Sequence, residues 1–178
     1  LCTPMAKALG TEQQTEVAAM LGEVWSYSAM IGAALRAAEA DSRDWGDGTW
    51  LPSPEPFLAL RPTVPGWMQR VNEIIKTLGA HNLLATPTDV DFDDPVLRPL
   101  LDLHLAGADI DARERARVFR TAWDWVGSAL GSRVELYEQF YLGSSNRNFR
   151  TAHRFAQMQP WNEVADFFTA SDEIFGAD

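Results

Sequence analysis

Two stretches of about thirty residues each repeat their apolar side chains with the period of a helix, and they constrain the fold more than any other feature. The first covers residues 11–40 and the second covers residues 111–142. No segment shows the strict alternation of a half-buried strand. A helix of this size extends roughly 45 Å, a length that is typical of bundles. We therefore predict an all-α fold, a helical bundle organised around two long helices.

Capping signals and prolines predict where the helices begin and end. Thr11, followed by Gln14, forms a capping-box pattern for the first long helix. Asp109 or Asp111 begins the second, where an early Glu114 interacts favourably with the helix dipole. Proline and glycine positions predict four shorter helices: 65–78, a part of 95–106 beginning near Pro99, 147–157 and 160–170.

Residues 41–64 are predicted to form a loop. Their many prolines and glycines leave space for no more than a turn or two of regular structure. We expect Trp45, Trp50, Phe57 and Leu60 to attach this loop to the bundle. Loops of this length are uncommon and are often functional or interfacial.

The composition argues against several classes of protein. With 15 basic and 25 acidic residues, the net charge is −10, which argues against a nucleic-acid partner. No apolar run reaches the roughly 18 residues of a membrane span, and no signal peptide opens the chain, so we expect a cytoplasmic protein without a membrane partner. The single Cys2 allows neither a disulfide framework nor a multi-cysteine zinc site, and we interpret it as an incidental thiol.

Motifs that carry chemistry by themselves are scarce. The histidines His81, His104 and His153 lie far apart in the sequence, and no Glu-x-x-His pair is present, so we expect no metal site. A phosphate-binding glycine loop and a nucleophile elbow are also missing from the sequence. These patterns alone leave the function open.

The second long helix combines aromatic and charged side chains. Seven tryptophans and nine phenylalanines in the chain imply a well-packed core or a large buried interface. We assign Trp123 and Trp125 to the core, where Asp124 between them would need a polar partner. A charged run on the same helix is interpreted as a solvated face; it consists of Arg113, Glu114, Arg115, Arg117 and Arg120.

The stretch GSRVELYEQFYLGSSNRN, residues 131–148, joins an aromatic face to a polar loop. Val134, Tyr137 and Phe140 recur at helical spacing, and we assign the first two to the core. The small residues Gly143, Ser144 and Ser145 then stop the helix and are followed by Asn146. An aromatic wall beside such a loop suits a planar organic ligand.

The segment ERARVFRTAWDWVGSALGSRVELYEQFYLGSSNRN resembles the C-terminal end of the 4-hydroxyphenylacetate 3-monooxygenase oxygenase family. Upstream, EIIKTLGAHNLLATPTDVDF and AALRAAEADS are similar to the same family, in the same order. The resemblance implies an acyl-CoA dehydrogenase-like fold with an α domain, a β domain and a C-terminal four-helix domain that builds a homotetramer. Residues 1–178 would be that last domain, incomplete, with 144–178 as a loop and tail helices. The opening LCTPMAKALG looks like the end of an earlier element.

The resemblance also implies roles for named residues. Phe140 would line the phenol pocket, and Asn146 would lie near the flavin ring, with Gly143, Ser144 and Ser145 shaping the loop beside the cofactor. The turn expected near the dinucleotide part of the flavin corresponds to Gly79, Ala80, His81 and Asn82. The family has two glycines in this turn, whereas Ala80 replaces the second one here. Catalytic residues are expected upstream of Leu1.

The activity that the resemblance implies is that of a two-component aromatic monooxygenase. A separate flavin reductase supplies FADH2, which reacts with O2 to a C4a-hydroperoxyflavin that hydroxylates a phenol ortho to its hydroxyl. The substrate is a phenolic small molecule or a carrier-bound tyrosine-like group. Two alternatives stay open: an acyl-CoA dehydrogenase or dehydratase-like flavoenzyme, and a non-catalytic helical oligomerisation module. A bundle lacking its first helix would associate through its apolar face.

Overall fold

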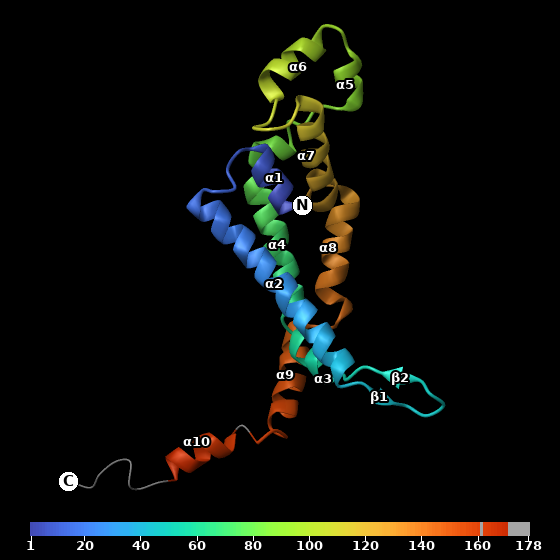
Figure 1. Cartoon of the computed structure of the whole chain (residues 1–178), viewed down its shortest axis with the longest axis vertical. Helices are drawn as coiled ribbons and strands as arrows, with labels where there is room; N and C mark the ends of the chain where they lie inside the picture. Colours follow the sequence, from blue (N-terminus) through green and yellow to red (C-terminus); the bar gives the residue numbers. More distant parts are fainter. Residues whose placement is uncertain (161, 171–178) are drawn as a thin grey trace, which may run out of the picture.

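The computed structural model describes residues 1–160 and 162–170, and the predicted all-α class is confirmed apart from one small hairpin (Figure 1). The predicted tail at 171–178 lies outside the described residues. The helices are α1 Cys2–Ala8, α2 Thr15–Ala40, α3 Glu55–Leu60, α4 Val64–Gly79, α5 Asp89–Asp93, α6 Leu97–Leu105, α7 Ala112–Val126, α8 Ala129–Tyr141, α9 Ser145–Ala156 and α10 Asn162–Thr169, with a 3₁₀ turn η1 at Ala80–Leu83. The two strands are β1 Arg43–Asp44 and β2 Trp50–Leu51.

The first long helix is confirmed, but its predicted beginning is wrong. It begins at Thr15 with Gln14 as the N-cap residue, and no side chain caps it. Thr11 belongs to the preceding turn, because its amide donates a hydrogen bond of 2.9 Å to the carbonyl of Ala6. Thr11 therefore closes the turn after α1 and does not cap α2.

The second long helix is two helices, so the prediction of one helix over 111–142 is wrong. Its beginning at Asp111 is confirmed by a capping box in which the aspartate accepts a 2.8 Å hydrogen bond from the Glu114 amide. The helix stops at Gly127, and Ser128 caps α8 by accepting a 2.9 Å hydrogen bond from the Gly131 amide. Serine favours this capping role over a helix interior, which explains the break.

The segment 41–64 contains a β-hairpin that the sequence did not predict. Its antiparallel register pairs Arg43 with Leu51 and Asp44 with Trp50. The turn is possible because Gly46, Asp47 and Gly48 all adopt positive φ angles. Trp45 and Trp50 are 72% and 64% exposed, so the expectation that they attach this loop to the bundle is wrong. The hairpin projects from the end of α2 (Figure 1).

The shorter helices agree better with the predictions. Helix α4 matches 65–78 closely, with Pro65 in its first turn. Helix α6 begins at Leu97, so Pro99 occupies the first turn, where its missing N–H has no intrahelical partner to lose. Helix α5 was not predicted; Thr88 and Asp91 form its capping box. The last two helices correspond to α9 and α10, and Trp161 lies outside the described residues.

The core lies where α1, α4 and α7 meet. Met5, Ile74 and Phe119 are among its largest buried side chains. Five tryptophans of the described part of the chain are exposed, including Trp123 and Trp125, so their assignment to the core is wrong. No helix among the described residues is long and apolar enough to cross a membrane.

Candidate functional site

The predicted site residues fall into two groups, which the structure does not bring together. Gly79 ends α4 and Ala80, His81 and Asn82 lie in η1, beside the beginning of α7. Phe140 and Gly143–Asn146 lie at the junction of α8 and α9, toward the opposite end of the elongated body (Figure 1). Helix α8 alone has 13 residues, a length of roughly 20 Å. The two groups therefore form separate candidate sites within one chain.

The α8–α9 junction is built by a glycine turn and a serine cap. Gly143 has a φ of +86°, a conformation that L-amino acids with a side chain rarely adopt. Ser144 caps α9 by accepting a 3.4 Å hydrogen bond from the Arg147 amide. Ser145 and Asn146 begin the helix and are exposed. The hydroxyl of Ser144 thus has a structural role, whereas the Asn146 amide makes no side-chain hydrogen bond with the described residues.

A second asparagine at this junction was missed by sequence reasoning. Asn148 is buried, and its Nδ2 donates hydrogen bonds to the carbonyls of Leu142 at 2.9 Å and Gly143 at 3.4 Å. Arg61 Nε also donates to the Leu142 carbonyl, at 3.1 Å. The sequence shows Asn146 and Asn148 two residues apart, but only the geometry of the turn decides which of the two amides points inward.

The aromatic wall beside the junction is open to solvent. Phe140 is 57% exposed, and the Tyr137 and Tyr141 rings stack with centroids 5.1 Å apart. The expectation that Val134 and Tyr137 belong to the core is wrong, since both are exposed and line a shallow groove on α8. A planar ligand would find one apolar wall here, and a second surface would have to cover it.

The turn after α4 is tightly packed. A Cβ added at Gly79 would lie only 2.4 Å from Leu83 Cγ, so a side chain does not fit without movement of Leu83. Ala80 has a φ of +43° and a ψ of −131°, which is strained for a residue with a Cβ. The chain thus keeps a positive φ in this turn although Ala80 stands where the second glycine is expected.

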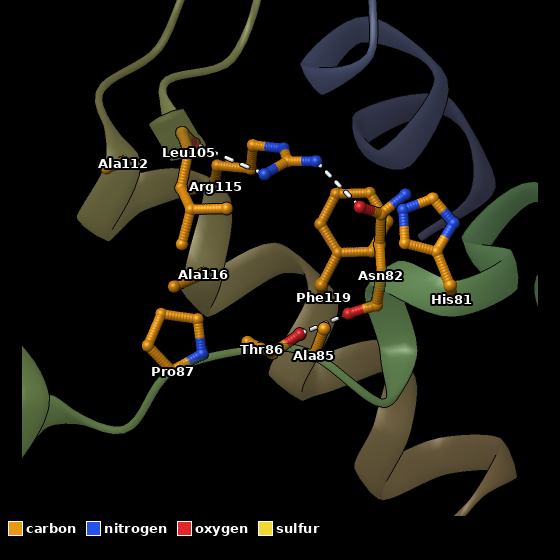
Figure 2. Close-up of a pocket in the computed structure, with 10 residues that line it drawn as sticks. All are labelled: His81, Asn82, Ala85, Thr86, Pro87, Leu105, Ala112, Arg115, Ala116 and Phe119. Atoms are coloured by element: carbon orange, nitrogen blue, oxygen red, sulfur yellow. Dashed lines mark hydrogen bonds between the residues drawn. The ribbon is translucent and has the colours of Figure 1, made fainter. Parts of the chain in front are cut away.

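A small cavity of about 90 Å³ lies behind this turn (Figure 2). It brings together side chains from η1, the following loop, α6 and α7. Its lining residues are His81, Asn82, Ala85, Thr86, Pro87, Leu105, Ala112, Arg115, Ala116 and Phe119. Two of the predicted site residues, His81 and Asn82, therefore meet the start of α7, which the sequence did not indicate.

Arg115 is the charged residue of this cavity, and its assignment to a solvated helix face is wrong. Its Nη2 donates a 2.8 Å hydrogen bond to Asn82 Oδ1, and its Nη1 donates one of 3.3 Å to the Leu105 carbonyl. The guanidinium carbon lies 5.3 Å from the centre of the Phe119 ring. Burial lowers the pKa of Arg115 from its ordinary value. Thr86 donates its hydroxyl hydrogen to the Asn82 carbonyl, which fixes the turn further (Figure 2).

The other polar candidates have structural or solvent-facing positions. Asp124 is exposed, so it needs no buried partner. Arg113 forms a 2.6 Å ion pair with Asp93. Within the described ranges, no group of three histidine, cysteine, aspartate or glutamate side chains is arranged to hold a metal.

The structure is similar to solved structures of larger proteins. It aligns with the crystal structure of the HpaB oxygenase component of 4-hydroxyphenylacetate 3-monooxygenase complexed with FAD and 4-hydroxyphenylacetate, with a TM-score of 0.86 and 30% identity, covering 98% of this chain and 37% of that one. An archaeal 4-hydroxybutyryl-CoA dehydratase from N. maritimus aligns with a TM-score of 0.73 and 16% identity, covering 95% of this chain and 34% of that one. The second likeness shows the fold alone.

Sequence comparisons point to the same group of proteins. The chain is 31% identical over 172 residues to the 4-hydroxyphenylacetate 3-monooxygenase oxygenase component of Thermus thermophilus, covering 96% of this chain and 36% of that protein. It is 35% identical over 145 residues to a Streptomyces globisporus monooxygenase that acts on a chloro-hydroxyphenyl group held by the peptidyl-carrier protein SgcC2. This match covers 79% of this chain and 28% of that protein. The chain spans about a third of the length of these relatives. Residues 1–169 match the family described as 4-hydroxyphenylacetate 3-hydroxylase C terminal, so the chain belongs to that family.

Proposed function

We propose that the chain is the C-terminal helical domain of the oxygenase component of a flavin-dependent aromatic monooxygenase. The observation that carries the proposal is the alignment of 98% of the chain, at 30% identity, with an oxygenase complexed with FAD and 4-hydroxyphenylacetate. The family match over residues 1–169 supports it independently of the structure. FAD is the cofactor that we propose, and O2 is the cosubstrate.

The α8–α9 junction fits a flavin ring and a phenol better than the cavity behind the α4 turn does. The free amide of Asn146 can both donate and accept hydrogen bonds, and Phe140 offers an apolar face. The cavity at Arg115 measures only about 90 Å³, well below the roughly 300 Å³ of pockets that enclose a whole organic ligand. We therefore place the ring system at the junction, with Gly143, Ser144 and Ser145 shaping the backbone beside it.

When bound, reduced flavin would supply the two electrons that activate O2, so that one oxygen atom goes to the phenol carbon ortho to the hydroxyl and the other leaves as water. The residues of this chain would orient the flavin and the phenol and exclude water from them. Asn146 orients polar atoms of the ring, Phe140 holds the phenol by apolar contact, and the covering surface excludes water, which would promote loss of peroxide. The residues that activate the phenol are proposed to lie outside residues 1–178.

The proposal extends to substrate class and partners. The relatives include enzymes named for 4-hydroxyphenylacetate and for a carrier-bound hydroxyphenyl group, so we propose a phenolic acid or a carrier-bound tyrosine-like substrate. The name oxygenase component implies a separate reductase that supplies FADH2. The exposed aromatic surface of α8 supports assembly into a homotetramer. A cytoplasmic location is consistent with the need for a flavin reductase and remains part of the proposal.

The test uses the natural protein that carries residues 1–178. Chemically reduced FAD and 4-hydroxyphenylacetate are mixed with it in buffer containing O2, and the products are separated by chromatography. We expect a catechol product and a transient flavin absorbance distinct from that of oxidised FAD. If reduced FAD does not bind and no hydroxylated product forms with any of a panel of phenols, the proposal is wrong.

A further inference from the structure

The carbonyl of Leu142 ends α8 and accepts two side-chain hydrogen bonds. Leu142 is the C-cap residue of this helix, and the last carbonyls of a helix have no intrahelical partner. Asn148 Nδ2 donates to this carbonyl at 2.9 Å, and Arg61 Nε donates to it at 3.1 Å. A carbonyl oxygen has two lone pairs, so both bonds can form together. The positive guanidinium also suits the negative end of the helix dipole.

These hydrogen bonds hold the peptide plane that joins Leu142 to Gly143. A peptide group is planar, so fixing its oxygen also restricts the N–H on its other side. That N–H belongs to Gly143 and donates to the Phe140 carbonyl at 2.9 Å. Gly143 has a φ of +86°, and glycine has more backbone freedom than any other residue. The plane is therefore restrained on both sides at the point where the backbone turns from α8 into α9.

Arg61 connects this turn to another part of the chain. It follows α3 and lies 81 positions before Leu142. Its amide donates to the Phe57 carbonyl at 2.9 Å, so its own backbone is fixed by the end of α3. Within the part of the chain that the structure describes, no other hydrogen bond reaches residues 142–148 from outside α8 and α9.

Helix α9 has little else to fix its direction. All of its 12 residues are described, and Asn148 alone is buried. Helix α9 extends from the end of α8 away from α1, α4 and α7, which enclose the core (Figure 1). A groove of about 400 Å³ lies between α3 and the second half of α9. Asn148 belongs to α9 and moves with it, so Arg61 provides the hydrogen bond that relates this helix to α3.

We propose that Arg61 is a positioning residue of the monooxygenase reaction: by holding the Leu142 carbonyl, it fixes the turn that directs Asn146 toward the flavin ring. The inference rests on the proposed function for the role of Asn146, and it adds a residue from a different segment to that site. Phe140 precedes the turn and is held by α8, so Arg61 should affect the flavin side of the site and leave the phenol wall in place. The role requires no contact between the guanidinium and either ligand.

The test compares Arg61→Met and Arg61→Lys in the natural protein that carries residues 1–178. Methionine removes the donor, whereas lysine keeps a positive donor. We expect Arg61→Met to lower the rate of hydroxylation by roughly 10-fold or more, the scale of misplacing one orienting group, with a matching rise in peroxide. The KM of the phenol should stay within about twofold, below the effect of one lost hydrogen bond. Arg61→Lys should recover most of the rate.

The fold should survive these substitutions, because Asn148 still donates to the Leu142 carbonyl. Thermal unfolding of each variant checks this. If Arg61→Met does not fold, Arg61→Gln takes its place in the same measurements, since its shorter side chain removes the charge and withdraws the donor from Leu142. The matched control is Arg36→Met, which removes an exposed arginine of α2 that makes no side-chain hydrogen bond with the described residues.

A double-mutant cycle with Asn146→Ala shows whether Arg61 acts through Asn146. If it does, Arg61→Met should have little further effect once the Asn146 amide is absent, because the two substitutions disturb the same contact. Effects on hydroxylation that simply multiply would contradict the inference. An unchanged yield of hydroxylated product in Arg61→Met would contradict it as well.

Amide hydrogen exchange of the flavin-free protein tests the restraint on the turn separately from the chemistry. The Gly143 and Asn148 amides form hydrogen bonds of the turn, to the carbonyls of Phe140 and Ser144. Arg61→Met should speed their exchange by roughly 3- to 10-fold, the effect of one hydrogen bond, and should not change exchange in α4. Unchanged exchange would overturn the inference even in a protein that hydroxylates phenols. Faster exchange in a protein that hydroxylates none would support the restraint by Arg61 and remove the proposed function.

Discussion

The indole nitrogen of Trp125 donates a hydrogen bond of 3.0 Å to Asn72 Oδ1, and this contact joins α7 to α4. Asn72 is only 1% exposed, and its Nδ2 has no partner among the described residues. The asparagine therefore depends on the tryptophan for its one side-chain hydrogen bond. Although Trp125 is 47% exposed, its indole N–H completes the hydrogen bonding of a buried amide oxygen.

Trp125→Phe should lower the free energy of unfolding by about 1–3 kcal/mol, because it leaves a buried amide oxygen unpaired. Urea denaturation of the natural protein measures the change. Trp123→Phe serves as the control, since Trp123 makes no side-chain hydrogen bond with the described residues. Adding Asn72→Leu to Trp125→Phe should recover part of the loss. Equal effects of the two tryptophan substitutions would contradict this account.

Gly131→Ala should destabilise the α7–α8 corner. A Cβ at this position would lie 2.2 Å from the carbonyl oxygen of Trp125 and 2.7 Å from that of Asp124, and both atoms belong to the backbone. Overpacking of this kind costs about 1–3 kcal/mol or more. Thermal unfolding of Gly131→Ala and of the exposed neighbour Ser132→Ala provides the comparison. A Gly131→Ala protein as stable as Ser132→Ala would show that the corner can shift freely.

Substitutions of the two asparagines of α9 should have different effects, one on stability and the other on flavin chemistry. Asn148→Ala removes the hydrogen bonds to Leu142 and Gly143, and we expect a loss of about 1–3 kcal/mol in unfolding free energy. Asn146→Ala removes an exposed amide and should change stability by less than about 0.5 kcal/mol. It should instead increase the fraction of reduced flavin that yields peroxide without hydroxylated product. Unchanged coupling in Asn146→Ala would exclude Asn146 from the flavin site.

Phe140→Ala should weaken phenol binding more than flavin binding. Because the side chain is 57% exposed in this chain, the fold does not depend on it. Loss of an apolar wall that a ligand buries corresponds to about tenfold or more in Kd. Titration of the phenol and of FAD, with Leu136→Ala as an exposed apolar control, measures both affinities. A parallel loss of the two affinities would indicate a structural disturbance and argue against a substrate contact.

The contact between α2 and α4 should depend on pH through Glu23. Arg70 donates to Glu23 at 2.9 and 3.1 Å, and Tyr27 donates at 2.6 Å. These hydrogen bonds, that of Arg70 first, lower the pKa of Glu23. The resulting stabilisation is present above the pKa of an unfolded glutamate, about 4.3, and is lost as the pH falls through the lower pKa of the folded protein.

Unfolding free energies of the wild type and Glu23→Gln, measured across the acid range, check this expectation. The difference between them should be constant near neutral pH and should close below the unfolded pKa. Glu16→Gln, which removes an exposed carboxylate without an ion pair in the described structure, should show no such trend. A difference that persists at the lowest pH would mean that Glu23 acts through packing and not through its charge.

Local signals predicted most of the helices. Pro65 at the start of α4 and the Asp111–Glu114 capping box act within one turn, so their effect can be read from neighbouring residues. The division at Gly127–Ser128 was missed because a helical period continues across it, and the choice between a serine cap and a continuous helix depends on packing. The hairpin was missed because its strands have only two residues each.

The sequence by itself determined the helical class, the family resemblance and the two segments that contain the candidate site residues, because periodicity, caps and motifs are local. Tertiary structure alone decided that Arg115 forms a hydrogen bond with Asn82 in the wall of a cavity, since 33 positions separate them and only the packing of η1 against α7 joins them. It also decided that Asn148 turns inward while Asn146 faces solvent. Side-chain direction depends on which surfaces the packed helices cover, and a linear pattern does not contain that information.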